Sequence, residues 1–305
     1  ILLSLLAMIS CHRIKHGEHV IHILTTNDVH GRYFDSLYVD NSTRPSVLSV
    51  SAYVDSLRTV WGEDNVVLID AGDCLQGDNA SFYYNFIDTV STHLYARMVD
   101  YIGYDAVVVG NHDIETGHPV YDRVRKDMKT PFLAANAIDE GTGKSYFEDY
   151  VILRKGGVKV AVIGFTNANI RNWLSPELWS GMDFKSLIPS AQELVDKVRM
   201  DEKPDVVIVA THSGVGSGDG NLLEGQGMDL FNSLSGVDFV ICAHDHRPVV
   251  HKNDTICLLN AGSHCRNLGH GRLALTVRNG RIVSRVLDGD LINIDRKKVD
   301  QEMKA

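Results

Sequence analysis

The sequence predicts an α/β fold in which two sheets are flanked by helices. Short, continuous apolar runs rich in β-branched residues recur along the chain, which is typical of strands buried on both faces. Between these runs lie longer segments whose apolar residues recur at helical spacing. Two glycine-containing turns, Gly156-Gly157 and Asn279-Gly280, each join two strand-like runs and therefore predict two hairpins.

The expected elements can be placed in chain order. Strands are predicted at 22–26, 66–69, 106–109, 132–135, 206–209 and 239–241, and hairpins at 150–165 and 273–287. Helices are predicted at 44–61, 86–102, 118–128 and 189–200. The first of these helices has Val47, Val50 and Val54 on one face, and the last has Pro189 near its first turn, where no N–H is needed.

Composition and charge restrict the class of function. The 305 residues include 44% hydrophobic and 23% charged residues, which is ordinary for a globular protein. No Pro/Ser-rich linker or internal repeat divides the chain, so we expect one domain with short tails. The net charge of -9 argues against polymeric nucleic acid as a partner, because phosphate backbones select basic surfaces. A small phosphate ester is compatible, because bound metal cations can dominate the local field.

Polar blocks follow five of the predicted strands. These blocks are Asp28-Val29-His30-Gly31, Gly72-Asp73, Gly110-Asn111-His112-Asp113, Thr211-His212-Ser213-Gly214 and Ala243-His244-Asp245-His246. The ends of neighbouring strands are where α/β folds place their ligand sites. An ordinary turn or a helix cap would explain any one block, but five in order predict a site for two metal ions. Carboxylate, amide and imidazole ligands suit Zn, Mn, Fe or Co.

The blocks and their surroundings resemble a known superfamily. The matching segments are Leu24-Thr25-Thr26-Asn27-Asp28-Val29-His30-Gly31, Asp70-Ala71-Gly72-Asp73, Leu133-Ala134-Ala135-Asn136 and Val162-Ile163-Gly164-Phe165-Thr166. The chain resembles the calcineurin-like metallophosphoesterases, and within them the N-terminal catalytic domain of the 5′-nucleotidase and 2′,3′-cyclic nucleotide phosphodiesterase family, over residues 20–287. This resemblance implies a four-layer α/β/β/α sandwich of two mixed sheets with flanking helices.

The resemblance also implies a ligand set and a reaction. One metal ion would take Asp28, His30, Asp73 and His246, and the other Asp73, Asn111, His212 and His244, with Asp73 as the bridging carboxylate. A hydroxide held between the two divalent ions would attack phosphorus in line. We expect a metal-dependent phosphohydrolase that acts on nucleotides in the manner of a 5′-nucleotidase.

Other functions stay open on the sequence alone. The alternatives are a 2′,3′-cyclic nucleotide phosphodiesterase with 3′-nucleotidase activity, a broad small phosphoesterase and, as a minor possibility, a sulfur-ester hydrolase on the same fold. His246 favours the cyclic activity slightly, because some nucleotidases have Gln at this position. A non-catalytic scaffold is disfavoured, because the chain retains the complete ligand set.

His112 and Glu115 are the predicted catalytic pair. The resemblance implies that His112 stabilises the phosphoryl group or protonates the leaving oxygen, while Glu115 orients its ring. The family usually has Gly-Asn-His-Glu-Phe-Asp here, so Asp113 and Glu115 occupy its two acidic positions in swapped order, and Glu115 could instead be a solvated helix residue. Asn111, His112 and Arg266 are predicted to contact substrate, and Asn27 and Asn136 to support the site.

The two ends of the sequence carry their own expectations. Residues 1–9 are almost wholly apolar and lead into Ser10-Cys11, which resembles the end of a bacterial lipoprotein signal; the alternative is a leader that packs on the domain. We therefore expect a signal remnant and tether at 1–19, a catalytic domain at 20–290 and a tail or linker helix at 291–305. Cys11 would anchor the protein by a lipid in the cell envelope, on the periplasmic or outer membrane.

A further domain is expected from the resemblance. Family members usually carry a C-terminal domain whose aromatic residues stack on the nucleobase. We expect either that a separate chain supplies it or that this domain acts alone with broad specificity.

Overall fold

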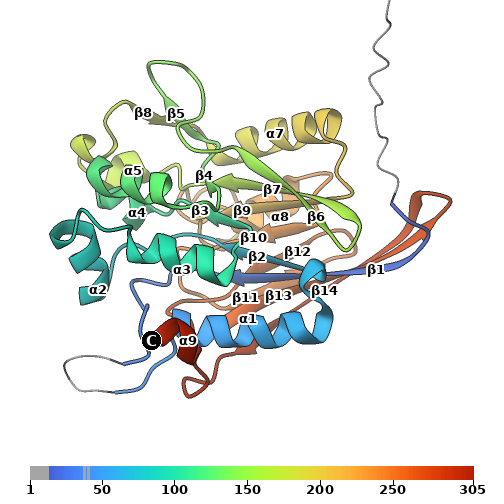
Figure 1. The fold of residues 1–305 in the computed structure, drawn as a ribbon. Helices are drawn as coiled ribbons and strands as arrows, with labels where there is room; N and C mark the ends of the chain where they lie inside the picture. Colours follow the sequence, from blue (N-terminus) through green and yellow to red (C-terminus); the bar gives the residue numbers. More distant parts are fainter. Residues whose placement is uncertain (1–13, 37–38, 40–41) are drawn as a thin grey trace, which may run out of the picture.

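Two six-stranded sheets packed face to face form the centre of the protein, and helices cover both outer faces (Figure 1). The computed structural model describes residues 14–36, 39 and 42–305. The predicted four-layer sandwich is confirmed. Cys11 and the apolar leader lie outside the described residues.

Sheet 1 has the strand order β14-β13-β1-β2-β3-β4. Its strands are β1 (Gly17–Thr26), β2 (Val66–Asp70), β3 (Ala106–Val108), β4 (Phe132–Leu133), β13 (Asn267–Arg278) and β14 (Arg281–Asn293). Strands β1 to β4 are parallel, and the β13–β14 hairpin pairs with β1 in antiparallel fashion. The carboxyl ends of β1, β2 and β3 therefore lie at the same edge of the sheet.

Sheet 2 has the strand order β11-β12-β10-β9-β7-β6. Its strands are β6 (Tyr150–Lys155), β7 (Val158–Phe165), β9 (Val206–Thr211), β10 (Phe239–Ile241), β11 (Val249–Lys252) and β12 (Cys257–Asn260). Strands β7, β9, β10 and β12 are parallel, and antiparallel strands flank them on both sides. A separate antiparallel pair joins β5 (Ala137–Asp139) to β8 (Met182–Phe184).

The helices form the two outer layers. The larger ones are α1 (Val47–Trp61), α3 (Leu94–Ile102) and α5 (His118–Asp127) against sheet 1, and α7 (Leu187–Asp201) and α8 (Gly227–Ser233) against sheet 2. The shorter ones are α2 (Asn79–Phe82), the π-helix η2 (Tyr83–Ile87), α4 (Asn111–Glu115), α6 (Ile170–Trp173), α9 (Gln301–Lys304) and two 3₁₀ turns, η1 (Glu63–Asn65) and η3 (Pro176–Trp179).

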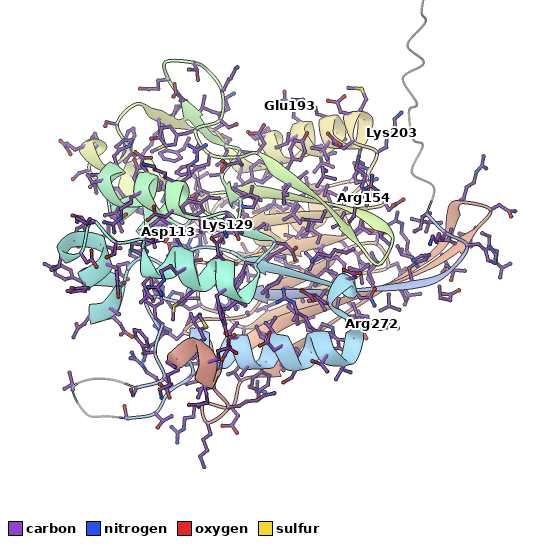
Figure 2. The ribbon with its side chains drawn as sticks, viewed as in Figure 1. Asp113, Lys129, Arg154, Glu193, Lys203 and Arg272 are labelled. Carbon is purple, nitrogen blue, oxygen red and sulfur yellow. The ribbon has the colours of Figure 1, made fainter. Side chains whose placement is uncertain are left out.

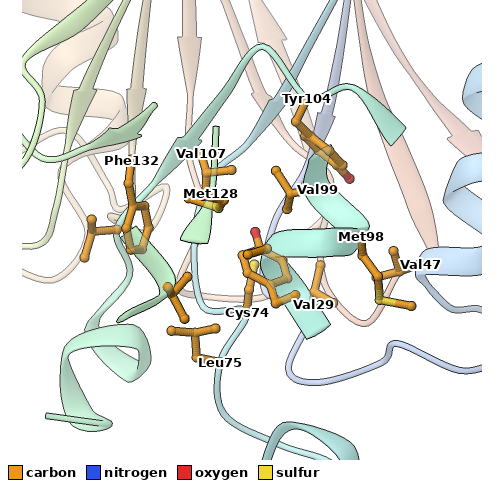
Figure 3. Close-up of a cluster of buried hydrophobic side chains, with 14 of the residues drawn as sticks. Val29, Val47, Cys74, Leu75, Met98, Val99, Tyr104, Val107, Met128 and Phe132 are labelled. Atoms are coloured by element: carbon orange, nitrogen blue, oxygen red, sulfur yellow. The ribbon is translucent and has the colours of Figure 1, made fainter. Parts of the chain in front are cut away.

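The alternation of side chains along each strand creates three apolar layers. In β2, Val67 and Ile69 face the other sheet, while Val66 and Leu68 face the helices. Strand β9 divides in the same way between the inter-sheet layer and the layer under α7 and α8. Figure 3 shows part of the layer between sheet 1 and its helices, including Cys74, which lies close to the predicted site.

One predicted helix is wrong. Residues 86–102 do not form one helix, because the chain turns at Asp88 before α3 begins at Leu94. The Asp88 carboxylate accepts hydrogen bonds from the N–H groups of Val90 (3.3 Å) and Ser91 (3.0 Å), which is a turn conformation. His93 then caps α3, because its Nδ1 accepts the N–H of Tyr95 at 3.2 Å.

Both ends of the described chain pack on the sandwich. Strand β1 begins at Gly17, inside the predicted tether, because Gly17 pairs with Val277 of β13. The end of the chain packs on α1, where the N–H of Asp300 donates to Leu48 O at 3.0 Å and Ser51 Oγ donates to Asp300 at 2.7 Å. The described residues include no helix long and apolar enough to span a bilayer. The four described cysteines, Cys74, Cys242, Cys257 and Cys265, are buried free thiols.

Candidate dimetal site

The five polar blocks meet at the edge of the sandwich where β1, β2 and β3 of sheet 1 and β9 and β10 of sheet 2 end. Backbone hydrogen bonds join the loops there. The N–H of Asp28 donates to Gly72 O at 2.9 Å, and the N–H of His30 donates to Asp73 O at 3.0 Å. The N–H of His264 donates to Asp28 O at 2.8 Å. The fold itself therefore fixes the positions of these side chains.

Two glycines allow the loops after β2 and β3 to approach each other. A Cβ atom on Gly110 would lie 2.1 Å from Asp73 Oδ1, which no real contact permits. Gly72 has a φ of +96°, and a Cβ atom there would lie 2.7 Å from Gly110 N. The glycines in the second and third blocks are therefore needed for the close approach that places Asp73.

The candidate ligands lie on unusual backbone. Five of them have φ in the left-handed region: Asp28 (49°), His30 (47°), Asp73 (60°), His244 (72°) and His246 (56°). Such a conformation costs a non-glycine residue on the order of 1–3 kcal/mol. It persists only where the surrounding structure enforces it, and it clusters at functional sites.

Six side chains gather into two groups of metal-binding type. The groups are Asp28, His30 and His246, and Asp73, His212 and His244, and in each the ligand atoms lie within 4.8 Å of one another. Asn111 Oδ1 lies 2.9 Å from His244 Nδ1, so the amide adjoins the second group. The structure thus brings all seven predicted ligands together, and their role in binding metal stays a prediction.

Two buried atoms, one in the second group and one on Asp28, have no hydrogen-bond partner and are suited to bind a cation. Asp28 Oδ1 and His212 Nε2 are buried, lie 3.9 Å apart and make no hydrogen bond. The other oxygen of Asp28 accepts from Asn27 Nδ2 (2.7 Å) and from the N–H of His244 (2.9 Å). The Nδ1–H of His212 donates to Ala71 O at 2.7 Å, so that Nε2 offers a lone pair when the ring is neutral. An unsatisfied buried polar atom costs about 1–3 kcal/mol, and a divalent cation would satisfy both atoms.

The electrostatics of the site favour the same interpretation. Burial alone would lower the pKa of His212, but the Asp73 carboxylate, 3.0 Å from Nε2, raises that pKa to about 10. Despite its burial, the pKa of Asp73 falls below its usual range because of His212. Burial lowers the pKa of His30, and it lowers that of His244 to about 4. His30 and His244 are therefore neutral donors, and a divalent cation would displace the proton that His212 shares with Asp73.

His112 stands beside the ligands without belonging to either group. Its N–H donates to Asp73 Oδ1 at 2.8 Å, and its ring centroid lies 5.5 Å from that of His30. Its Nδ1 contacts Glu115 Oε2, and no hydrogen bond to Nε2 is present among the described residues. The predicted contact between His112 and Glu115 is therefore present, although the Glu115 side chain is 43% exposed.

Asp113, the other acid of this block, has a structural task that the sequence did not reveal. Its buried carboxylate accepts the N–H groups of Asp73 (3.0 Å), Cys74 (2.9 Å), Leu75 (2.9 Å) and Gly110 (2.8 Å). Figure 2 labels Asp113 among several charged residues, and most of the others are exposed, whereas the Asp113 carboxylate is buried. Asp113 therefore holds together the two loops that carry Asp73 and the third block.

Three neighbours of the ligands were not predicted. Arg32 and Gln76 line a cavity of about 380 Å³ together with His30, and Gln76 Oε1 lies 3.2 Å from His30 Nδ1. Among the described residues, no carboxylate forms an ion pair with Arg32. The Trp173 ring stacks on His244, with centroids 4.9 Å apart and planes 19° apart. Arg32 and Gln76 lie only one and three residues beyond polar blocks, whereas no nearby sequence signal marks Trp173.

The other predicted site residues, Arg266, Asn27 and Asn136, differ in their distance from the candidate ligands. Arg266 is exposed and does not line this cavity. Asn27 contacts Asp28, as described above. Asn136 is buried, but its Nδ2 donates to Thr166 O (3.0 Å) and Lys185 O (3.2 Å), so it joins loops and contacts no candidate ligand.

Histidine and carboxylate groups at the carboxyl edge of a two-sheet sandwich are the arrangement expected of a metal-dependent hydrolase. The comparison with known families gives the same class. The family described as Calcineurin-like phosphoesterase matches residues 21–248. The chain belongs to this family of metal-dependent phosphohydrolases.

Several known proteins are similar to this chain. Protein UshA of Salmonella pullorum is 32% identical over 202 residues, which is 66% of this chain and 35% of that protein. A 5′-nucleotidase of Vibrio cholerae is 31% identical over 192 residues, which is 63% of this chain and 33% of that protein. The chain thus spans about a third of the length of these relatives. The crystal structure of the calcineurin-like phosphoesterase YfkN from Bacillus subtilis covers 91% of both chains with a TM-score of 0.79 and 23% identity, which shows a shared fold.

Proposed function

We propose that this chain is a dimetal phosphohydrolase that acts on nucleotides in the manner of a 5′-nucleotidase. The observation that carries this proposal is the pair of ligand groups in which Asp28 Oδ1 and His212 Nε2 are buried without hydrogen bonds, with His112 beside them. Similarity to proteins named 5′-nucleotidase supports nucleotides as the substrate class.

Each residue of the site has a defined task in this proposal. Two bound divalent ions would supply a nucleophilic hydroxide and neutralise charge on the phosphoryl oxygens. Asp28 and Asp73 hold a fixed negative charge for the cations, and their backbone is fixed by the loops. Glu115 accepts the Nδ1–H of His112, so that His112 Nε2 can donate a proton or a hydrogen bond to an ester or phosphoryl oxygen.

The test is phosphate release by the purified chain. The substrates are 5′-, 3′- and 2′,3′-cyclic nucleotides and 4-nitrophenyl phosphate, each with Mn²⁺ or Zn²⁺ and with a chelator. We expect metal-dependent release from 5′-nucleotides, which His112→Ala lowers at least about 100-fold without lowering the metal content. No release from any ester by the metal-loaded protein would refute the proposal.

A cyclic nucleotide diesterase is a second candidate. His246 favours it slightly, because some nucleotidases have Gln at this position. Here the imidazole belongs to the first ligand group, and its Nε2 lies 3.4 Å from Asp28 Oδ1. A coupled phosphomonoesterase makes opening of the cyclic ester visible in the same assay. A higher kcat/KM for the 2′,3′-cyclic nucleotides than for the 5′-nucleotides would select this candidate.

We further propose that Cys11 carries a lipid and that the catalytic domain lies outside the cytoplasmic membrane as an envelope lipoprotein. The support is the apolar run before Cys11 in the sequence. The test is the partition of the full chain and of Cys11→Ser into detergent after expression in bacteria. Equal partition of the two proteins would refute the lipid anchor.

A further inference from the structure

An apolar cavity adjoins the candidate catalytic histidine. It has a volume of about 350 Å³, and its lining includes Leu75, Phe82 and Phe86 together with His112 and Glu115. Helix α2 and the π-helix η2 supply the two phenylalanines, and Figure 1 shows these helices at the same end of the molecule as α4. The cavity therefore lies between a short aromatic segment and the block that carries His112.

The aromatic walls are open to solvent. Phe82 is 57% exposed and Phe86 is 49% exposed, and their ring centroids lie 5.3 Å apart at an interplanar angle of 57°. Two neighbouring exposed aromatic rings in a cavity are unusual for a globular surface and are typical of binding sites. Flat aromatic ligands are the natural occupants of such walls, because rings stack on rings with little loss of side-chain freedom.

The polar residues in the lining are largely used by the protein itself. Ser81 Oγ donates to Asp78 O at 2.6 Å. The buried Asn85 donates from Nδ2 to Leu75 O at 2.6 Å, and its Oδ1 lies 2.9 Å from His93 Nε2. These bonds hold the aromatic segment in place, and they leave few polar groups to select a ligand. Recognition in this cavity must therefore depend mainly on apolar contact and shape.

The cavity adjoins the proposed reaction site. Gln76 and Gly77 line both this cavity and the cavity of about 380 Å³ that contains His30 and Arg32. The second cavity is polar and lies beside the candidate metal ligands, whereas the first is apolar and lies beside His112. A phosphate ester of an alcohol that carries an aromatic ring likewise has a polar part, the phosphoryl group, and an apolar part, the ring.

We propose that the cavity of Phe82 and Phe86 binds the leaving group of the substrate and selects phosphate esters whose alcohol carries a flat aromatic ring, such as a nucleoside or an aryl alcohol. This inference rests on the proposed phosphohydrolase function. It assigns a specificity determinant to the catalytic domain itself, on the segment 79–87. His112 lines the apolar cavity, and its ring centroid lies 5.5 Å from that of His30 in the polar cavity, so the oxygen that joins the phosphoryl group to the alcohol would lie near His112.

The test compares esters that share the phosphoryl group and differ in the alcohol. The substrates are 5′-AMP, 4-nitrophenyl phosphate and glycerol 3-phosphate, and the variants are Phe82→Ala, Phe86→Ala and the double variant. We expect each single variant to lower kcat/KM about 10-fold for the two aromatic esters and less than about 2-fold for glycerol 3-phosphate. Tyr83→Ala is the matched control, because Tyr83 is 48% exposed on the same segment but does not line the cavity.

The outcomes separate this inference from the proposed function. Equal losses for all three esters would indicate a structural role of the phenylalanines, and unchanged values would indicate that the cavity does not hold the leaving group; either result overturns the inference while the phosphohydrolase stands. Equilibrium dialysis of adenosine against the full chain gives a readout without turnover. Weaker binding to the double variant than to Tyr83→Ala supports the inference even if no ester is hydrolysed, and equal binding refutes it.

Discussion

Asp113 offers the sharpest test of how this site is built. Its carboxylate is the acceptor for four buried N–H groups, those of Asp73, Cys74, Leu75 and Gly110. In Asp113→Ala these four donors lose their partner, and each unsatisfied buried donor costs about 1–3 kcal/mol. Part of this cost is offset, because burial raises the pKa of Asp113 and so makes its charged form unfavourable.

The net loss for Asp113→Ala should therefore be about 3–5 kcal/mol of the free energy of unfolding, the range for breaking a buried charged network. Asp113→Asn should lose about half as much, because one amide oxygen still accepts while its NH₂ group faces two donors. Losses of this size are a large share of the total stability of a domain. Because Asp113 holds the loop that carries Asp73, both variants should also bind metal poorly.

The assay is urea unfolding followed by circular dichroism, with a chelator in every sample so that metal does not contribute. Asp64→Ala is the control, because Asp64 is exposed in the 3₁₀ turn η1, and it should change stability by less than about 0.5 kcal/mol. A stability of Asp113→Ala within about 1 kcal/mol of the parent would contradict the reasoning, since the four N–H groups would then have found other partners.

Three further predictions follow from the same structure. Gly110→Ala should destabilise the protein by about 1–3 kcal/mol and lower its metal content, because the new Cβ atom would lie 2.1 Å from Asp73 Oδ1; unfolding and metal analysis check this, and normal metal content would contradict it. His93 is buried with its pKa lowered to about 3 by burial and by Arg123, so its folded pKa lies below the unfolded value, and its stabilising neutral form is lost as pH falls from about 6.5 toward 3. His93→Gln should therefore lose about 2 kcal/mol less stability than the parent between pH 7.5 and 5, and equal losses would refute the assignment. Mn²⁺ at about 100 times its Kd should raise the free energy of unfolding by about 2.7 kcal/mol, and Asp28→Asn should abolish most of that gain; a gain that survives in Asp28→Asn would remove Asp28 from the ligand set.

The sequence predicted the layers because its strands are continuous apolar runs, which is typical of sheets covered on both faces. In β2, for example, Val67 and Ile69 face the other sheet while Val66 and Leu68 face the helices, and all four are apolar because both faces are covered. The convergence of the polar blocks was also predictable, since parallel strands end at the same edge. The helix predicted at 86–102 failed because Asp88 closes a local turn, which competes with the helix through side-chain hydrogen bonds.

Other parts of the site could not be predicted from one sequence. The task of Asp113 depends on N–H groups about forty residues away in the chain, and no local pattern reveals them. The stacking of Trp173 on His244 depends on how α6 packs over the end of β10. Such contacts arise only when a sheet brings together loops that are distant in the chain.

The candidate metal site lies between the two sheets, so it can form only after the sheets have packed on each other. His212 follows β9 in sheet 2 but donates to Ala71 O after β2 in sheet 1. The N–H of His244, after β10, donates to the carboxylate of Asp28, after β1. Each ligand group contains residues from both sheets. A complete metal site can therefore exist only in the closed sandwich, and bound metal must stabilise the packing of one sheet on the other as well as the loops that hold it.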